Sequence, residues 1–297
     1  MSDTIAHPPF TGIYNFRDIG RVVNTTSGKW LVREKLFYRA GRLDDASPSD
    51  NEKLISDLNL RTVIDLRTKS EHILQAQTHQ ARKNRYLATG VGLGTHSVLD
   101  EGPWETIRIN FIGREFELNV LRQLKWWQMI WFLTLMLLQF RMAALRILGR
   151  NVLCPKGLLG LSKDSLRFCQ AEIREALEVF TDVKRYPVLI NCTQGKDRTG
   201  LVVMLVLFAI GVPIELVRAD YSLSNEGLAP IRASMIEEVE AIGMDAAYTL
   251  APPEAVDTVW NFLQEEYGGV DGYLDAIGFG EPKRHALQKI LLEDLLL

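Results

Sequence analysis

The chain has 297 residues, of which 47% are hydrophobic, enough for one large domain or two modest ones with a substantial core. Its 34 lysines and arginines nearly balance its 37 aspartates and glutamates, which excludes a strongly basic nucleic-acid-binding protein. Three cysteines without a CxxC pair, and five histidines without paired ligand spacing, predict neither a disulfide framework nor a metal or other cofactor.

The first third of the chain predicts alternating strands and helices. The segment 35–39, KLFYR, predicts a strand, and Ser47 followed by proline predicts the start of a helix. The run 60–66, LRTVIDL, predicts a second strand. Residues 71–85 predict another helix, and 107–112 another strand. This alternation favours a parallel sheet flanked by helices.

An unusually apolar stretch follows, within a helical region that extends from 114 to 150. Residues 126–138 read WWQMIWFLTLMLL, a mostly apolar run of 13 residues, which is short of the ~20 needed to span a bilayer. The first interpretation is a helix buried in the protein. The alternatives are a lid or a surface-lying helix that contacts a membrane through 126–148, and a true membrane span.

The remaining segments are mostly helical. Residues 154–161 predict a loop, and 164–179 predict a helix from their apolar spacing. After Pro213 the periodicity predicts a series of helices, at 214–221, 227–242, 254–267, 271–277 and 283–296.

The most informative stretch is the polar loop 191–200, NCTQGKDRTG, between an apolar strand at 188–190 and an apolar helix at 201–210. A loop of this kind is where α/β proteins usually bind a ligand. Its backbone N–H groups can form an anion-binding nest, and Gly195 permits a tight turn. The positive field at a helix start favours the thiolate of Cys192, and the planar fork of Arg198 can bind two phosphate oxygens.

The three cysteines provide an internal control. The residue six positions after Cys154 is Gly160, and the residue six positions after Cys169 is Glu175. Only Cys192 has an arginine at that position, and only Cys192 lies between a strand and a helix. The pattern therefore predicts a nucleophile at Cys192 and structural thiols at the other two positions.

The loop resembles the phosphate loop of the cysteine-dependent tyrosine phosphatases. Its GKDRTG form is similar to a subgroup that includes secreted mycobacterial and many fungal tyrosine and lipid phosphatases. Further matches cover nearly the whole chain except 90–104. They are Phe16-Arg17-Asp18-Ile19-Gly20, Tyr38-Arg39, Asp65-Leu66-Arg67, Tyr267-Gly268-Gly269 and Tyr273-Leu274.

The resemblance implies an α/β, protein-tyrosine-phosphatase-like fold, with a parallel-rich central sheet flanked by helices. The chain would be a single phosphatase domain over 1–297 with a helical lid insertion at 113–150. Cys192 would form a phosphocysteine, and Arg198 would bind phosphate in the ground and transition states. Thr199 would stabilise the leaving thiolate. The loop residues that would bind substrate are Thr193, Gln194, Gly195, Lys196, Asp197 and Arg198.

Two features of the sequence depart from that family. Asn191 replaces the histidine that usually precedes the cysteine, and Arg21 stands where a glycine is frequent.

No WPD segment supplies the acid that protonates the leaving group. Asp197, Asp65 and Asp164 are the candidates, although Asp65 could instead pair with Arg39 or Arg67.

Three further expectations complete the sequence-based interpretation. Arg17 and Asp18 are expected to form a structural ion pair or to support the loop. The substrate is expected to be a phosphotyrosine protein, with a phosphoinositide or an inositol phosphate as alternatives, and a weakly active phosphate-binding pseudophosphatase as the rival. The chain start does not resemble a signal peptide, so the location is expected to be cytoplasmic, with membrane association as an option.

Overall fold

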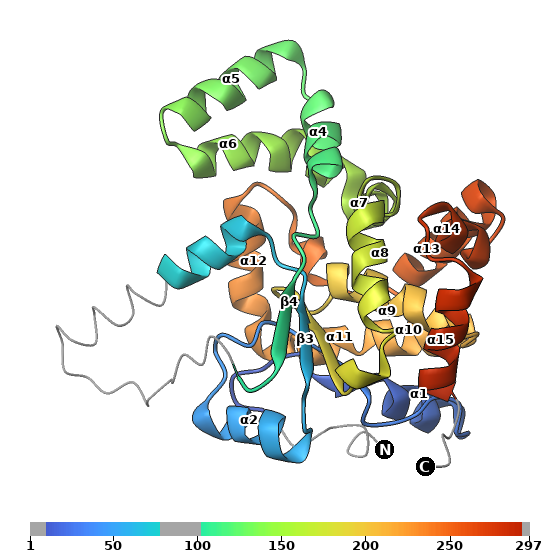
Figure 1. Ribbon diagram of the computed structural model, residues 1–297. Helices are drawn as coiled ribbons and strands as arrows, with labels where there is room; N and C mark the ends of the chain where they lie inside the picture. The colour runs from blue at the N-terminus through green and yellow to red at the C-terminus, as the bar shows by residue number, and fades with distance from the viewer. Residues whose placement is uncertain (1–9, 78–101, 293–297) are drawn as a thin grey trace, which may run out of the picture.

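A computed structural model describes residues 10–77 and 102–292 and contains one mixed five-stranded sheet (Figure 1). The strand order is β1-β2-β5-β3-β4, and β1 is antiparallel to β2 whereas the other neighbours are parallel. The strands are β1 (Arg17–Asp18), β2 (Phe37–Ala40), β3 (Thr62–Asp65), β4 (Glu105–Arg108) and β5 (Val188–Asn191). The predicted parallel-rich α/β fold is therefore confirmed.

The strand register brings the polar strand ends together. Asn191, the last residue of β5, lies opposite Ala40 of β2 on one side and Asp65 of β3 on the other. Because carboxyl ends of parallel strands share one edge of a sheet, the loop after β5 opens between the segments that follow β2 and β3.

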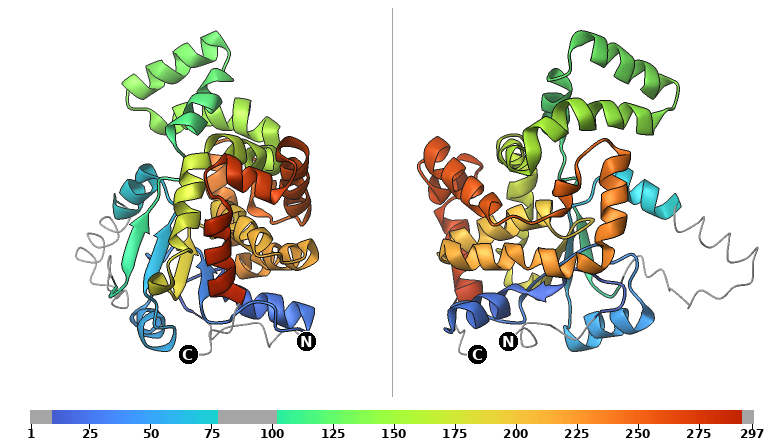
Figure 2. Two further views of the ribbon diagram at one scale, coloured as in Figure 1. Left: turned by 45° about the vertical axis from the view of Figure 1, so that its right-hand side comes forward. Right: turned by 180° about the vertical axis from the view of Figure 1, so that it is seen from behind.

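Helices cover the sheet and extend beyond its carboxyl edge (Figure 2). The helices of the first half, besides a described helical segment at 69–77, are α1 (Ile19–Ser27), α2 (Pro48–Glu52), α4 (Arg114–Arg122), α5 (Trp126–Leu137) and α6 (Arg141–Leu148). Those of the second half are α7 (Cys154–Phe168), α8 (Gln170–Val179), α9 (Asp197–Ala209), α10 (Ile214–Ser222), α11 (Ser224–Gly227), α12 (Arg232–Ala241), α13 (Glu254–Tyr267), α14 (Val270–Ala276) and α15 (Glu281–Leu292).

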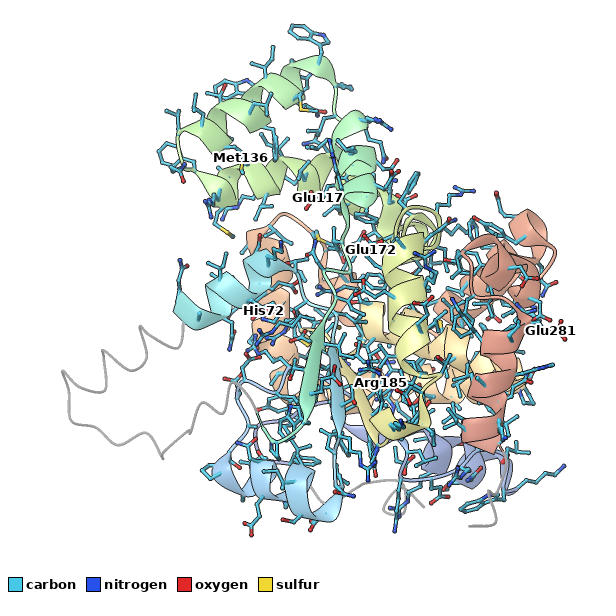
Figure 3. All side chains as sticks on the ribbon, in the orientation of Figure 1. His72, Glu117, Met136, Glu172, Arg185 and Glu281 are labelled. Carbon is cyan, nitrogen blue, oxygen red and sulfur yellow. The ribbon has the colours of Figure 1, made fainter. Side chains whose placement is uncertain are left out.

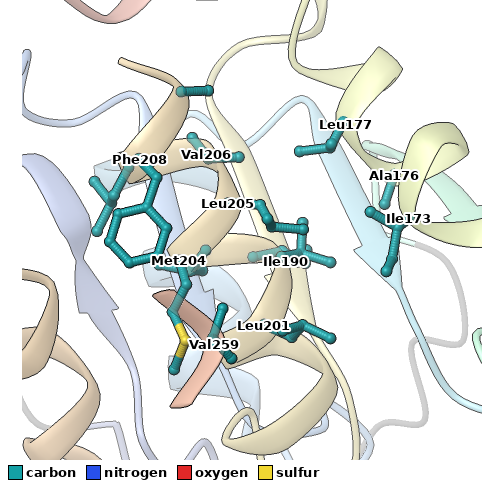
Figure 4. Close-up of a cluster of buried hydrophobic side chains, with 14 of the residues drawn as sticks. Ile173, Ala176, Leu177, Ile190, Leu201, Met204, Leu205, Val206, Phe208 and Val259 are labelled. Carbon is teal, nitrogen blue, oxygen red and sulfur yellow. The ribbon is translucent and has the colours of Figure 1, made fainter. Parts of the chain in front are cut away.

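Helix α9 lies at the centre of the hydrophobic core. It is apolar on all sides, as expected for a helix that is surrounded by protein. Figure 4 shows its side chains among those of β5, α8 and α13. Phe208 of α9 packs edge-on against Trp260 of α13, with ring centroids 5.0 Å apart. The loop that precedes α9 is consequently attached to a helix whose residues from Thr199 to Ala209 are all buried.

Several predicted elements are confirmed, and one is wrong. Ser47 caps α2 as expected, because its hydroxyl accepts from the Asp50 backbone and the Asp50 carboxylate accepts from Ser47 in return. Residues 154–161, predicted as a loop, belong to helix α7. Pro155 at the first turn is compatible with a helix start, and Gly157, with φ of 67°, absorbs a kink within it. Of the helix predicted over 71–85, residues 78–85 lie outside the described ranges.

The segment 113–150 folds into α4 and a hairpin of α5 and α6 that projects from the rest of the molecule (Figures 1 and 2). The first interpretation of 126–138 as a buried helix is wrong, since most large side chains of α5 are exposed. Apolar residues on every side of a helix ordinarily indicate burial, but here no other part of the described chain covers the outer face. Within residues 10–77 and 102–292, no helix is long and apolar enough to cross a membrane.

Candidate active site

Residues 192–196 form a loop between the end of β5 and the start of α9, and Asp197 and Arg198 lie in the first turn of that helix. Cys192 is buried, with 2% of its surface exposed. Gly195 has φ of 65°, and a Cβ there would lie 2.0 Å from the Ala40 carbonyl oxygen. Only glycine fits this position, so the tight turn predicted at Gly195 is confirmed.

Two side chains from the start of the chain hold the loop in place through its carbonyl groups. Nδ2 of Asn15 donates to the carbonyl oxygens of Gln194 and Gly195, both at 3.0 Å. Nη2 of Arg39 donates to the Gly195 carbonyl at 2.7 Å. With its carbonyls occupied on this side, the loop can turn its N–H groups toward an anion.

A buried carboxylate, Asp220 of α10, connects these supporting groups. Its Oδ1 accepts from Nε of Arg17 at 2.7 Å, and its Oδ2 accepts from Nη1 of Arg39 at 2.6 Å. Burial opposes the charge of Asp220, but the two guanidinium groups outweigh it and hold its pKa below the usual value. Arg17 also donates to Oδ1 of Asn15 at 2.5 Å, so one network connects Asp220 to the loop.

The prediction of an ion pair between Arg17 and Asp18 is wrong. Asp18 instead caps α1 and accepts from the Lys35 backbone N–H at 2.6 Å. Burial raises the pKa of Asp18 to about 6. The alternative expectation, that this segment supports the loop, agrees with the contacts of Arg17.

Glu71 orients the guanidinium of Arg198. Nη1 and Nη2 of Arg198 each donate to one oxygen of Glu71, both at 2.6 Å, a bidentate arrangement. The Glu71 carboxylate also accepts from the Thr193 and Thr68 hydroxyls. Burial disfavours the charge of Glu71, yet these hydrogen bonds outweigh it and lower its pKa to about 2. Glu71 is therefore ionised and fixes the plane of the Arg198 fork.

Lys196 and Asp197 form an ion pair at the start of α9. Nζ of Lys196 lies 2.6 Å from Oδ1 of Asp197 and donates to the Leu250 carbonyl at 2.9 Å. Lys196 is completely buried, whereas the Asp197 side chain is 43% exposed. The Lys196 ammonium is thus not presented at the surface for a larger anion in this conformation, and its substrate-binding role stays a prediction.

The two other acid candidates are engaged in ion pairs. Both oxygens of Asp65 accept from the guanidinium of Arg67, at 2.7 and 3.0 Å, and its side chain is 6% exposed. Asp164 lies inside α7, paired with Lys156, and not at a helix start as expected. The structure therefore leaves Asp197 as the most accessible carboxylate of the three.

Two buried polar groups close to Cys192 in the chain are unpaired within the described ranges. The hydroxyl of Thr199 and Oδ1 of Asn191 have no hydrogen-bond partner there. An unpaired buried hydroxyl is free to donate to a charged sulfur, which is the role predicted for Thr199. Asn191, in contrast, does not hold the loop through its amide oxygen.

Cys169 lies outside the loop, between two helices. It is buried at the junction of α7 and α8, and burial raises the pKa of its thiol to about 12. The thiol is therefore protonated at neutral pH, in agreement with a structural role. In residues 10–77 and 102–292, no group of three His, Cys, Asp or Glu side chains is arranged to hold a metal ion.

The sequence interpretation missed Asn15, Glu71 and Asp220. Only Glu71 carried a usable local signal, because Thr68 and Glu71 have the spacing of a capping box at a helix start. Asn15 and Asp220 act across 180 and 181 positions of the chain, respectively, which no local pattern reveals.

A hollow beside the loop supplies a candidate substrate surface. It is lined by Thr193 and Gln194 of the loop, Tyr14 and Arg42 from the first segment, and Met235 of α12 among others. Its lining combines an aromatic, a cationic and, in Glu238, an anionic group, and it adjoins the loop through Thr193 and Gln194 without including Cys192 or Arg198.

The site consists of a buried cysteine and an oriented arginine six positions later, between a parallel strand and a buried helix. These features define a member of the cysteine-dependent phosphatase superfamily. More particularly, the chain belongs to the tyrosine phosphatase family, whose model matches residues 8–293. The predicted membership of the tyrosine phosphatases is thereby confirmed, while the assignment to the GKDRTG subgroup stays a prediction.

Curated relatives agree with this family. The chain is 30% identical over 128 residues to the triple specificity protein phosphatase PtpB of Mycobacterium tuberculosis, covering 36% of this chain and 44% of the relative. It is 30% identical over 110 residues to a tyrosine-protein phosphatase of Nostoc commune, covering 34% and 37%. It is 47% identical over 47 residues to the inositol diphosphatase DSP2 of rice, covering 16% and 23%. Each match spans less than half the length of the relative.

Proposed function

We propose that the protein hydrolyses phosphate monoesters through a phosphocysteine on Cys192, and that its substrates are phosphotyrosine proteins. The observation that carries this proposal is the bidentate contact between Glu71 and Arg198. It orients a guanidinium six positions from a buried thiol, on a loop whose carbonyls are already held by Asn15 and Arg39. That arrangement suits a tetrahedral dianion better than any other ligand class.

The reaction proceeds in two displacements at phosphorus. The Cys192 thiolate attacks, an S–P bond forms, and the P–O bond to the leaving alcohol or phenol breaks as its oxygen takes a proton from an acid. Water then attacks the phosphocysteine, the S–P bond breaks, and inorganic phosphate and thiolate are released. Arg198 and the loop N–H groups stabilise the charge on the equatorial oxygens in both steps, and the Thr199 hydroxyl donates to the departing sulfur.

Asp197 is the acid that the geometry favours. Although it pairs with Lys196, its side chain is 43% exposed on the first turn of α9, next to Arg198. Both oxygens of Asp65 accept from Arg67, and the Asp65 side chain is only 6% exposed. Asp197→Asn should flatten the basic limb of the pH–rate profile for substrates with poor leaving groups, while Asp65→Asn should leave its shape unchanged. The reverse result would transfer the role to Asp65.

A phosphoinositide or inositol-phosphate substrate is the second candidate. It is favoured by the short match to a relative named inositol diphosphatase. A panel of phosphotyrosine peptides, phosphothreonine peptides, phosphoinositides and soluble inositol phosphates separates the two. A higher kcat/KM for phosphotyrosine peptides is expected, and a preference for inositol headgroups would replace the first candidate.

Turnover of p-nitrophenyl phosphate in the presence of EDTA tests the reaction itself. Wild type should be active without added metal, and Cys192→Ser should lose all measurable turnover while still binding phosphate analogues. Cys169→Ser is the matched control and should retain activity, because that thiol is buried outside the loop. If wild type and Cys192→Ser were equally inert, a phosphate-binding pseudophosphatase would be the correct description.

A further inference from the structure

Helix α5 exposes apolar side chains to water and buries a polar one, the reverse of an ordinary surface helix. Gln128 is buried and donates to Oδ1 of Asn151 at 2.8 Å. The outer face carries Trp126, Trp131 and Leu137, which are 77%, 59% and 82% exposed. Of the 20 large hydrophobic side chains that are exposed in the described residues, 11 lie between 126 and 145. A patch of this size requires a partner.

The charges around this patch have a single sign. From Leu118 to Arg150 the sequence contains no aspartate or glutamate, although the whole chain is net negative. All of its basic side chains in this stretch are exposed, namely Arg122, Lys125, Arg141, Arg146 and Arg150. The occupant of the patch must therefore combine an apolar interior with negative charge at its surface.

The hairpin of α5 and α6 is held firmly at its base and is free at its outer face. Nε of Arg146 donates to the Ala241 carbonyl at the end of α12 at 2.6 Å, and Phe132 and Met129 pack against the core. Figure 3 shows the side chains of the hairpin, including Met136, extending from a ribbon that stands apart from the body. A rigid base with an exposed apolar face suits docking onto a flat surface.

We propose that this hairpin docks the protein onto an anionic lipid bilayer, inserting its tryptophans and leucines at the interface while Arg122, Lys125 and Arg141 contact lipid headgroups. A second copy of the hairpin is disfavoured, because pairing would bring two sets of five cations together without a counter-charge. A span is excluded for the described helices by their length. Tryptophan, with an apolar ring and an N–H donor, suits the interface between hydrocarbon and headgroup.

Docking would turn the active site toward the membrane. The hairpin follows the carboxyl end of β4 and the loop at Cys192 follows that of β5, and these strands run parallel in one sheet. Both features thus lie toward the carboxyl edge of the sheet, and Figure 1 shows the hairpin beyond that end of β4. Helix α12, which the hairpin contacts at Ala241, also lines the hollow beside the loop through Met235. This second part of the inference rests on the proposed function and predicts a preference for membrane-borne phosphate esters.

Co-sedimentation with vesicles tests docking without any catalytic readout. Cys192→Ser protein should bind vesicles of phosphatidylcholine with phosphatidylserine, and bind weakly to phosphatidylcholine alone or at high salt. Replacing Trp126 and Trp131 by alanine should reduce the partition coefficient by about tenfold or more. Replacing Arg122 and Arg141 by glutamine should reduce it by about tenfold, and only for the anionic vesicles.

The matched control is Trp30→Ala, a tryptophan that is 62% exposed and follows α1 by three residues. Helix α1 lies at the opposite end of the molecule from the hairpin (Figure 1). The control variant should bind like the parent protein. Loss of binding in this control, or no vesicle binding by the parent, would overturn the inference, as would a dimer in solution that the hairpin substitutions dissociate. Turnover of p-nitrophenyl phosphate by the hairpin variants should be unchanged, so failure of docking and failure of the proposed function give different results.

Discussion

The loop at Cys192 and the hairpin of α5 and α6 are opposite in which kinds of side chain they bury and expose. Around the loop, charged groups are buried and nearly every one has a partner, as in the contacts of Asp220 with Arg17 and Arg39. On the hairpin, large apolar groups are exposed and cationic side chains have no acidic neighbour in the local sequence. The loop region buries polar and charged groups, and the hairpin exposes apolar surface to water.

The difference indicates which interactions each region has completed. A buried charge is tolerable only when it is paired and hydrogen-bonded, so the loop must reach its final geometry within the folded chain. An exposed apolar face costs free energy that a partner can recover on binding. The loop is therefore preorganised for a small anion, whereas the hairpin is prepared for a large apolar surface.

The largest expected effect is on Arg198. Arg198→Lys keeps the positive charge but removes the planar fork that Glu71 orients, so kcat/KM for p-nitrophenyl phosphate should fall by about 10³-fold or more. Steady-state kinetics with the wild type measures this. A loss below tenfold would mean that charge alone, and not the oriented fork, is what the loop requires.

The next effect concerns Asp220, which neutralises two buried arginines. Asp220→Asn leaves Arg17 and Arg39 facing each other without a counter-charge, and should lower the free energy of unfolding by about 3–5 kcal/mol. Urea denaturation measures the loss. Asp257→Asn removes a pair with Arg218 that is much more exposed, and should change stability by about 1 kcal/mol or less. Equal losses in the two variants would contradict the contrast drawn between buried and exposed charge.

The sequence predicted the catalytic loop well because its determinants are local. Cys192, Gly195 and Arg198 lie within seven positions, and the apolar segments on either side predict the strand and the helix. The supports were not predictable, since Arg17 reaches Asp220 across 203 positions and the adjacent Asp18 looked like a better partner. Contacts of that kind depend on how α10 packs against the first strand, which periodicity does not encode.

The intermediate effect concerns Glu71. Glu71→Gln removes one of the two oxygens that accept from Arg198 and places an amide donor against a guanidinium, so kcat/KM should fall by about 10- to 100-fold. An increase in activity would instead show that Glu71 competes with phosphate for Arg198.

The same variant makes a prediction about pH. The pKa of Glu71 is depressed to about 2 in the folded protein, so its carboxylate contributes stability that is complete above its ordinary value of about 4.5. That contribution is lost as the pH falls from about 4.5 to about 2. The difference in unfolding free energy between wild type and Glu71→Gln should shrink over this range, as measured by urea denaturation at several pH values. A constant difference would contradict the assigned pKa.

The hairpin shows where sequence patterns fail in the other direction. Residues 126–138 and 201–210 are both almost uninterrupted apolar runs, yet α5 is exposed and α9 is enclosed. The sequence pattern identifies a helix that is apolar on every side, but it does not indicate whether protein, lipid or another molecule covers that helix. Only the packing of the surrounding elements distinguishes these cases.

The smallest expected effect is that of Leu137→Ala, and the same substitution at a buried leucine provides the comparison. Leu137 of α5 is 82% exposed and Leu205 of α9 is fully buried. Leu205→Ala should cost about 2–5 kcal/mol of unfolding free energy, because it leaves a cavity beside β5 and α8. Leu137→Ala should change it by about 0.5 kcal/mol or less, because the side chain already faces water. If Leu137→Ala proved as costly as Leu205→Ala, the outer face of α5 would have to be covered in the free protein, and the apolar surface that the proposed bilayer contact requires would not exist.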